Sequence, residues 1–212
     1  MNILLLNDDR WHPGHISREG VKPLEQLGYH FDVVSDGAVI QAIDFSQYPV
    51  ILFVKSDNRT AADESKWADE AARVRLLRFV QDGGGLLAVH SGTAGYDGLK
   101  DMHALLGGLF LAHPPQLPVT VTPKAGHPLT TGVQAFTEPD EHYFLDMADQ
   151  PADVFLTAAS RHGATPAGWT RREGRGKVCV LTPGHNVAVW LNPEFQRLLR
   201  NALDWCAERE VQ

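Results

Sequence analysis

The sequence predicts an α/β fold, in which a doubly wound, mostly parallel sheet carries helices on both faces and continues into an antiparallel β extension. Strand-like apolar runs alternate with helical patterns through the first half of the chain. The run at 50–54 is apolar throughout, which is typical of a parallel strand buried on both faces. From about residue 117 the β segments are shorter, and the last two flank a turn rich in glycine and arginine.

The first half is expected to supply the parallel strands, at 2–7, 31–34, 50–54 and 86–89. A helix over 16–27, ended by Gly28, separates the first two strands. A second helix is predicted to begin at an Asp63 cap and to stop at a left-handed Gly83. Its apolar residues recur at helical spacing: Trp67, Ala71, Val74 and Leu77.

The second half is expected to add short strands, at 119–121, 143–145, 154–157, 167–170 and 177–181. The last two form a hairpin around the turn that contains Arg175. A final helix begins at an Asn192 cap, with Pro193 at its first position. Its core face is predicted to consist of Phe195, Leu198, Leu199, Ala202 and Cys206.

Composition favours one compact domain over residues 1–212. The net charge of −7 and the lack of a dense basic run other than the hairpin turn make nucleic acid and anionic membranes poor partners. The apolar run at 2–7 is too short for a signal-peptide core or a membrane span. Cys179 and Cys206 have no metal or redox spacing, so we expect buried free thiols in a reducing cytoplasm.

The segment 83–96 predicts a functional loop at one edge of the sheet. Three glycines precede a short apolar strand, and His90 stands where that strand must turn into small residues. Open α/β sheets bind ligands at the carboxyl ends of their strands, and other enzymes place a serine or cysteine nucleophile at such an elbow. The chemistry here must instead involve a histidine.

Several of the ten histidines follow predicted strands. His12 comes after the first strand, His90 ends the elbow strand and His185 follows the hairpin strand. The loops after parallel strands meet at one edge, so these three side chains are expected to converge. His113 is expected to reach them from a later loop. A histidine in a loop is more often a surface residue, and this reading is preferred for His15, His30, His103 and His162.

Carboxylate and aromatic residues complete the predicted site. Glu141, before a predicted strand, is a candidate general base, metal ligand or orienting group for a histidine; the alternative is a solvated acidic turn. Flat walls for a sugar ring are expected from Trp11, Tyr96, Tyr143 and Trp190, although core packing is the commoner role of such residues.

The motifs, taken in order, resemble those of the ThuA-like (trehalose utilisation) family within the class I glutamine amidotransferase-like superfamily. The resemblance rests on segments 83–85 with 88–90, 105–108 with Phe110 and His113-Pro114, 127–130, 140–143, and 176–178 with Gly184-His185, and it ends in the helix bearing Trp205. It implies a flavodoxin-like fold and a role in carbohydrate metabolism, around trehalose or related disaccharides and their oxidised keto forms.

The resemblance also places His90 where amidotransferase relatives carry the catalytic cysteine, and His185 where they carry the histidine that activates it. Neither Cys179 nor Cys206 can replace that thiolate. Hydrolysis of glutamine through a thioester is therefore not expected.

The leading hypothesis is a cytoplasmic hydrolase or lyase acting on a glycoside or keto-sugar. His90, His185 and Glu141 would share acid and base roles. The metal ligands, if a divalent ion such as zinc is bound, would be His12, His90, His113 and His185. No nucleotide cofactor is expected, and a homodimer is compatible with a small domain of this kind.

Two alternatives stay open. The first is a non-catalytic module that binds a sugar or a partner at the same edge, which the missing nucleophile favours. The second uses Ser91, otherwise a candidate substrate-binding residue, as a nucleophile with His185 as its base. The motif Gly-x-Ser-x-Gly would need glycines at Val89 and Thr93, and this disfavours the second alternative.

Overall fold

The computed structural model describes residues 1–149 and 152–208. Within them, the main sheet has nine strands in the order β2-β1-β3-β4-β11-β10-β9-β6-β7. Its first five strands are parallel: β2 (His30–Val34), β1 (Asn2–Asn7), β3 (Val50–Val54), β4 (Gly85–Val89) and β11 (Gly176–Leu181). The remaining four are antiparallel: β10 (Gly163–Glu173), β9 (Asp153–Ser160), β6 (Leu117–Pro123) and β7 (Phe136–Asp140). A separate antiparallel pair contains β5 (Gly108–Ala112) and β8 (Phe144–Met147).

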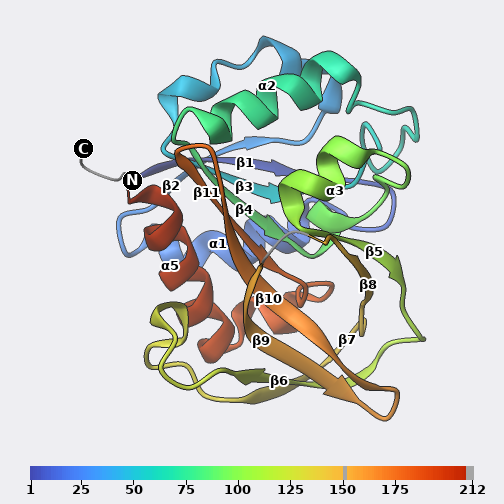
Figure 1. Cartoon of the computed structure of the whole chain (residues 1–212), viewed down its shortest axis with the longest axis vertical. Helices are drawn as coiled ribbons and strands as arrows, with labels where there is room; N and C mark the ends of the chain where they lie inside the picture. The colour runs from blue at the N-terminus through green and yellow to red at the C-terminus, as the bar shows by residue number, and fades with distance from the viewer. Residues whose placement is uncertain (150–151, 209–212) are drawn as a thin grey trace.

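Helices cover both faces of the parallel half (Figure 1). One face packs against α1 (His15–Glu25), α4 (Val187–Leu191) and α5 (Pro193–Ala207). The other packs against α2 (Glu70–Gln81) and α3 (Lys100–Leu106). In the described part of the chain, four 3₁₀ turns join these elements: η1 (Gly37–Ala42), η2 (Phe45–Gln47), η3 (His90–Thr93) and η4 (Pro128–Thr130). The predicted doubly wound α/β fold is therefore confirmed, with its antiparallel extension.

Alternate residues of each parallel strand enter different cores, because side chains point to opposite faces of a sheet. In β1, Ile3 and Leu5 join the α1/α5 side, whereas Leu4 and Leu6 join the α2/α3 side. All of β3 and β4 is buried, which explains why these strands read as continuous apolar runs. None of the helices in the described part of the chain is both long and apolar enough to cross a membrane.

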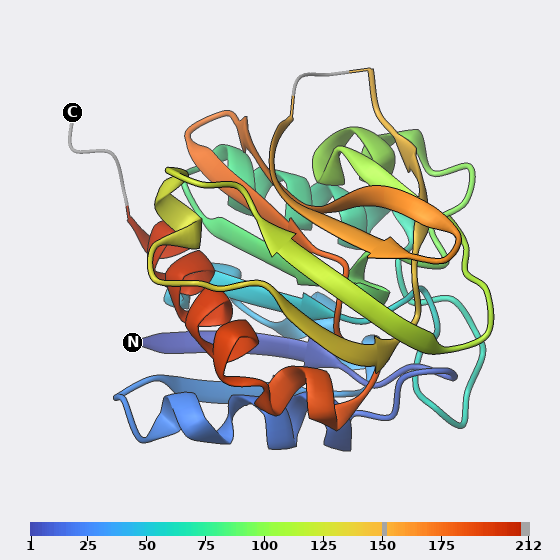
Figure 2. The ribbon, with the colours of Figure 1, turned by 90° about the horizontal axis from the view of Figure 1, so that it is seen from below.

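The antiparallel half curls back toward the parallel half (Figure 2). Strand β7 lies four places from β11 in the sheet order, a separation of about 19 Å at about 4.8 Å per strand in a flat sheet. Nevertheless, Asp140 at the end of β7 accepts a hydrogen bond of 2.9 Å from the backbone of Gly184, in the loop after β11. The curl thus brings the loop after β7 to the carboxyl ends of the parallel strands.

Most of the predicted elements agree with the structure to within a few residues. The final helix begins at the Asn192 cap and buries its whole predicted core face. Gly83 has a positive φ of 108° immediately after Asp82, the C-cap of α2, and the β10–β11 hairpin turns at Arg175, as expected. Both cysteines are free and buried. The first helix ends at Glu25, two residues before the predicted boundary.

The start of the second predicted helix is wrong. Helix α2 begins at Glu70, capped by Asp69, and its buried stripe consists of Ala72, Leu76 and Val80. Asp63 instead accepts a hydrogen bond from the backbone of Ser65 within an irregular loop. The loop is held by side-chain bonds across the chain, since the Trp67 indole donates to the Ser56 carbonyl. These tertiary bonds override the local helical spacing.

Candidate functional site

His90 is the first residue of η3 and stands at the sharp turn that directly follows β4. Its φ is 50°, a left-handed conformation that is uncommon for residues other than glycine. Gly92 allows the turn to pack against β3, because a Cβ at this position would lie 2.2 Å from the Phe53 carbonyl oxygen. The turn leaves the His90 side chain 1% exposed at the carboxyl edge of the sheet. A strained backbone kept at such an edge is typical of functional positions.

The hydrogen bonds of His90 fix which ring nitrogen is available. Nδ1 lies 2.7 Å from the Thr182 carbonyl oxygen, which can only accept, so Nδ1 carries a proton. With Nδ1 as the donor, Nε2 is the ring nitrogen that can accept a hydrogen bond or bind a cation. The Tyr143 hydroxyl lies 3.0 Å from Nε2, and the Tyr143 ring stacks on the imidazole with centroids 4.3 Å apart. One oxygen of Glu141 lies 3.3 Å from the same nitrogen.

His12 is oriented by Asp9, which is fully buried. The Nδ1 atom of His12 lies 2.8 Å from a carboxylate oxygen of Asp9, and the same oxygen accepts the backbone N–H of His12. Nδ1 is therefore the protonated nitrogen, and Nε2 presents its lone pair to the other histidines. This Nε2 is buried and has no hydrogen-bond partner within residues 1–149 and 152–208.

The loops after β7 and β11 supply Glu141 and His185, and a buried carboxylate joins the two loops. Asp140 accepts the backbone N–H groups of Gly184 and His185, at 2.9 and 3.0 Å. The Nδ1 atom of His185 lies 3.2 Å from an oxygen of Glu141. The imidazole and the carboxylate are not oriented for a hydrogen bond. The buried Nδ1 atom of His185 therefore also lacks a hydrogen-bond partner among the described residues.

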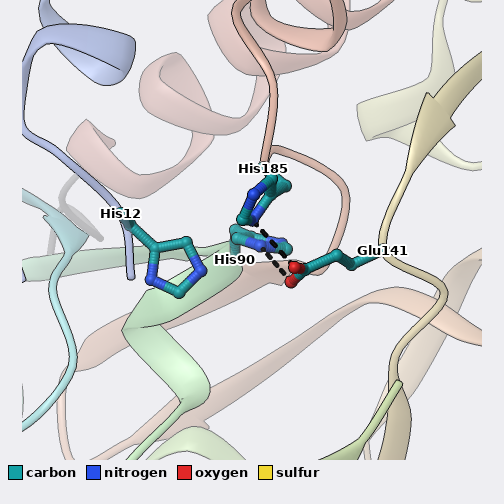
Figure 3. Close-up of side chains that lie close together, drawn as sticks. All are labelled: His12, His90, Glu141 and His185. Carbon is teal, nitrogen blue, oxygen red and sulfur yellow. Dashed lines mark ion pairs between the residues drawn. The ribbon is translucent and has the colours of Figure 1, made fainter. Parts of the chain in front are cut away.

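These four side chains form one compact cluster (Figure 3). One potential ligand atom from each of His12, His90, Glu141 and His185 lies within 4.8 Å of all the others. The three imidazole centroids are 4.9 to 5.4 Å apart. Three imidazoles and one carboxylate are a ligand set suited to a divalent transition metal. We call this group the ligand cluster.

The outer partners of the ligand cluster also fit a metal site. Histidines that bind metals usually donate their second ring N–H to a carboxylate or a backbone carbonyl. Asp9 plays that part for His12, and the Thr182 carbonyl plays it for His90. Each of these histidines keeps one potential ligand nitrogen within 4.8 Å of a Glu141 oxygen, and the nitrogen of His90 also contacts the Tyr143 hydroxyl. Such an arrangement requires protons or a cation between them.

The pKa shifts of Glu141, His185 and His12 indicate how the cluster is protonated when no metal ion is bound. Burial raises the pKa of Glu141, but contacts with His185 and His90 outweigh it and hold the pKa well below its usual range. The neighbouring Glu141 carboxylate raises the pKa of His185. Burial lowers the pKa of His12, against the opposing effect of Asp9. At neutral pH Glu141 is therefore ionised and His12 neutral, as ligands must be.

The ligand cluster borders a cavity of about 560 Å³, within the size range of small-molecule sites. Its lining combines the cluster with aromatic and apolar side chains: Trp11, His12, Ala94, Phe110, His113, Glu141, Tyr143 and His185. His113 also contacts Glu141, with its Nε2 3.5 Å from the carboxylate oxygen that His185 approaches. The Nδ1 atom of His113 donates to the Pro114 carbonyl.

The structure thus brings together His12, His90, His185 and Glu141, with His113, Trp11 and Tyr143 around the same cavity. His113, a predicted ligand, is not one of the four clustered groups.

Three other predicted residues lie apart from the cavity lining. Tyr96 is 1% exposed and donates to the Lys55 carbonyl, in the core on the α2/α3 side. Trp190 is in the opposite core, and Ser91 is fully buried.

Sequence reasoning missed Asp9, Asp140 and the Thr182 carbonyl, which orient the histidines. Asp9 has a recognisable signal, because it follows a strand whose carboxyl end lies at the ligand edge. Asp140 stands next to Glu141, yet its backbone bonds to the loop after β11 depend on the curl of the sheet. The Thr182 carbonyl offers no side-chain signal at all.

Similar solved structures share this fold. A putative ThuA-like protein from Parabacteroides merdae aligns with a TM-score of 0.80 at 20% identity, over 100% of this chain and 92% of that one. A putative ThuA-like protein from Bacteroides uniformis gives a TM-score of 0.71 at 18% identity, over 97% and 91%. A cytoplasmic protein from Salmonella typhimurium gives 0.70 at 15% identity, over 99% and 100%.

No curated protein sequence matches the chain significantly. A family model does, and its match extends over residues 4–206, nearly the whole chain. The model describes the ThuA family, trehalose utilisation. The chain therefore belongs to the ThuA family.

Proposed function

We propose that this protein is a metal-dependent enzyme of carbohydrate metabolism, a hydrolase or lyase acting on trehalose-like glycosides or keto-sugars. The observation that carries the proposal is the ligand cluster, in which two buried imidazole nitrogens, on His12 and His185, face a carboxylate without hydrogen-bond partners among the described residues. Leaving buried polar atoms without hydrogen bonds is costly, and a divalent cation would satisfy both nitrogens together.

The family and the cavity support the choice of substrate. The family model describes trehalose utilisation, and the cavity combines aromatic walls with the polar cluster, as sugar binding requires. A bound metal ion would polarise a hydroxyl or carbonyl oxygen, or activate water. Zinc fits this donor set, as do other divalent ions of the first transition row.

The residues of the chain supply binding and proton transfer around the cluster. His113 has Nδ1 held by the Pro114 carbonyl, and its Nε2 lies at the cavity, 3.5 Å from a Glu141 oxygen. Tyr143 keeps its proton, since burial raises the pKa of its phenol well above the usual value, and its hydroxyl can donate. Phe110 packs against Tyr143, with centroids 4.4 Å apart, and helps to exclude water.

Elemental analysis of the purified protein tests the metal, and sugar release from trehalose and its keto form tests the activity. We expect about one divalent ion per chain, and loss of both metal and turnover in Glu141→Gln and His90→Ala. Activity in fully metal-free protein would overturn the metal-dependent form and leave acid and base catalysis by His185 and Glu141. Saturable sugar binding without turnover under any metal would instead favour a sugar-binding module.

Cellular location is part of the same proposal. Both cysteines are buried free thiols, which suits a reducing compartment. The Salmonella neighbour is described as a cytoplasmic protein, which supports the same location for this chain.

A further inference from the structure

Trp11 combines two properties that are uncommon in one residue. It is 66% exposed, although large aromatic side chains are usually covered, and it lines the cavity next to the ligand cluster. It also immediately precedes the cluster residue His12 in the chain. An exposed tryptophan at the rim of a cavity offers a large, flat surface to a ligand that projects from the cavity.

The backbone of Trp11 is fixed relative to the ligand cluster. Its N–H donates to the Asp9 carboxylate oxygen at 3.0 Å, and this same oxygen accepts the backbone N–H of His12 at 3.1 Å. One buried carboxylate therefore sets the position of both residues. The backbone that carries the indole is therefore held at a fixed distance from the cluster, as the base of a binding platform must be.

The inner part of the cavity has its own aromatic wall. Tyr143 is buried and packed between His90 and Phe110, so the wall beside the ligand cluster is rigid. A ligand ring placed there contacts the cluster on one side and apolar atoms on the other. A second ring joined to it would extend toward the rim, where Trp11 stands.

The charges around the cavity favour an uncharged ligand. The lining contains no lysine or arginine among the described residues. A divalent ion in the cluster would be balanced by the carboxylate of Glu141, within the cluster, and by that of Asp9, which contacts His12. Arg10, whose guanidinium lies over the Trp11 ring, is paired with Glu64. An anionic group on the ligand would therefore gain little attraction.

We propose that Trp11 forms an outer subsite for the second ring of an uncharged disaccharide, whose first ring lies against the ligand cluster. The aromatic face attracts the C–H groups of a sugar ring because of its negative quadrupole, and covers apolar area on binding. This inference rests on the proposed function for its sugar chemistry. It adds a residue that selects disaccharides over single rings. The cavity lining, which has no lysine or arginine among the described residues, gives a phosphorylated sugar no advantage.

Ligand-observed NMR titrations test the subsite, since they measure binding whether or not turnover occurs. The probes are trehalose, methyl α-D-glucoside as a single ring, and trehalose 6-phosphate. In Trp11→Ala we expect the Kd for trehalose to rise about tenfold, or about 1.4 kcal/mol, with the Kd for the single ring unchanged. Trp11→Phe, the matched control, keeps an aromatic face and should keep most of the preference for trehalose. In the wild type, trehalose 6-phosphate should bind no more tightly than trehalose.

Three results would overturn the subsite: equal weakening of both neutral sugars in Trp11→Ala, no weakening of either, or tighter binding of the phosphorylated sugar. The first would mean that Trp11 acts through His12. Wild-type protein that binds neither neutral sugar would overturn the proposed function as well. If the protein proves metal-free or inactive while Trp11→Ala still weakens the binding of trehalose alone, the subsite stands and the catalytic proposal fails.

Discussion

The Asp9 carboxylate accepts hydrogen bonds from Trp11, from the backbone and ring of His12, and from the backbone of Ser56. Both of its oxygens are used, and every donor is a nitrogen. The carboxylate thus connects the loop after β1 to the loop after β3 and fixes the His12 tautomer. Burial opposes its ionisation, but the bond with His12 holds the pKa of Asp9 below its usual value.

The substitution Asp9→Asn tests this positioning role. Wherever the amide nitrogen is placed, it meets an N–H donor, so the loop must shift and His12 loses its fixed orientation. We expect the metal affinity to fall by about 10- to 100-fold, as for other outer partners of metal ligands. Competition with a chromophoric chelator measures the change.

Asp8→Asn is the matched control. Asp8 is the next residue, with a φ of 73°, which asparagine tolerates well. It accepts the backbone N–H groups of Gly14 and Ala61 and contacts no residue of the ligand cluster through these bonds. Equal losses of metal affinity in the two variants would show that Asp9 acts only on loop stability.

The sequence allows the cluster histidines to be predicted but not all of their partners. His12, His90 and His185 follow strands whose carboxyl ends must share an edge, so topology alone brings them together. Tyr96 and Tyr143 look alike in sequence, yet only Tyr143 meets the cavity, because the Tyr96 hydroxyl is drawn to the Lys55 carbonyl. Whether a tyrosine packs in the core or lines the cavity depends on its partners elsewhere in the fold, and the local sequence pattern does not specify those partners.

At the scale of elements, an ion pair between Arg59 and Asp36 connects two of the loops at the carboxyl edge of the parallel strands. Arg59, after β3, makes a two-pronged contact with Asp36, after β2, at 2.7 and 3.0 Å. Asp36 also caps η1 by accepting the N–H of Ala38. The Arg59 hydrogen bond, followed by the Ala38 bond, lowers the pKa of Asp36 from 3.8 to about 2.

This shift gives a pH dependence of definite sign. Because the folded-state pKa is below the unfolded value, the Asp36 contribution to stability is present above about pH 4 and is lost as the pH falls toward 2. Asp36→Asn keeps a good cap but removes the charge. We expect urea unfolding to show the variant less stable than the wild type at pH 7, with the difference vanishing near pH 2. A difference that is constant with pH would contradict an electrostatic origin.

At the scale of the whole molecule, the ligand cluster joins parts that are distant in sequence. His12 and His90 come from the parallel half, whereas Glu141 follows β7, at the far edge of the sheet. Strand β7 runs in the same direction as β11, because three strands with alternating direction separate them. The curl of the sheet then closes the distance. Sequence periodicity indicates the strands, but it carries no measure of this curl.

A ligand that needs all of these loops can bind only the native state, and it must therefore raise the stability of the whole fold. At a free metal concentration of 100 times Kd, the gain is about 2.7 kcal/mol. For a chain of this size we expect a rise in Tm of about 5 to 10 °C. Thermal unfolding of chelator-treated protein, with and without Zn²⁺, Mn²⁺, Co²⁺ or Ni²⁺, measures the shift.

Glu141→Gln removes the charged ligand at the far edge of the sheet while keeping the side-chain shape, and its Tm should respond much less to the same ions. His162→Gln is the control on the exposed turn between β9 and β10, outside the ligand cluster, and it should respond like the wild type. If the ions raise the Tm of Glu141→Gln as much as that of the wild type, the metal binds elsewhere. If none of the ions changes the wild-type Tm, the cluster does not bind a metal ion, and protons alone compensate its buried nitrogens and carboxylate.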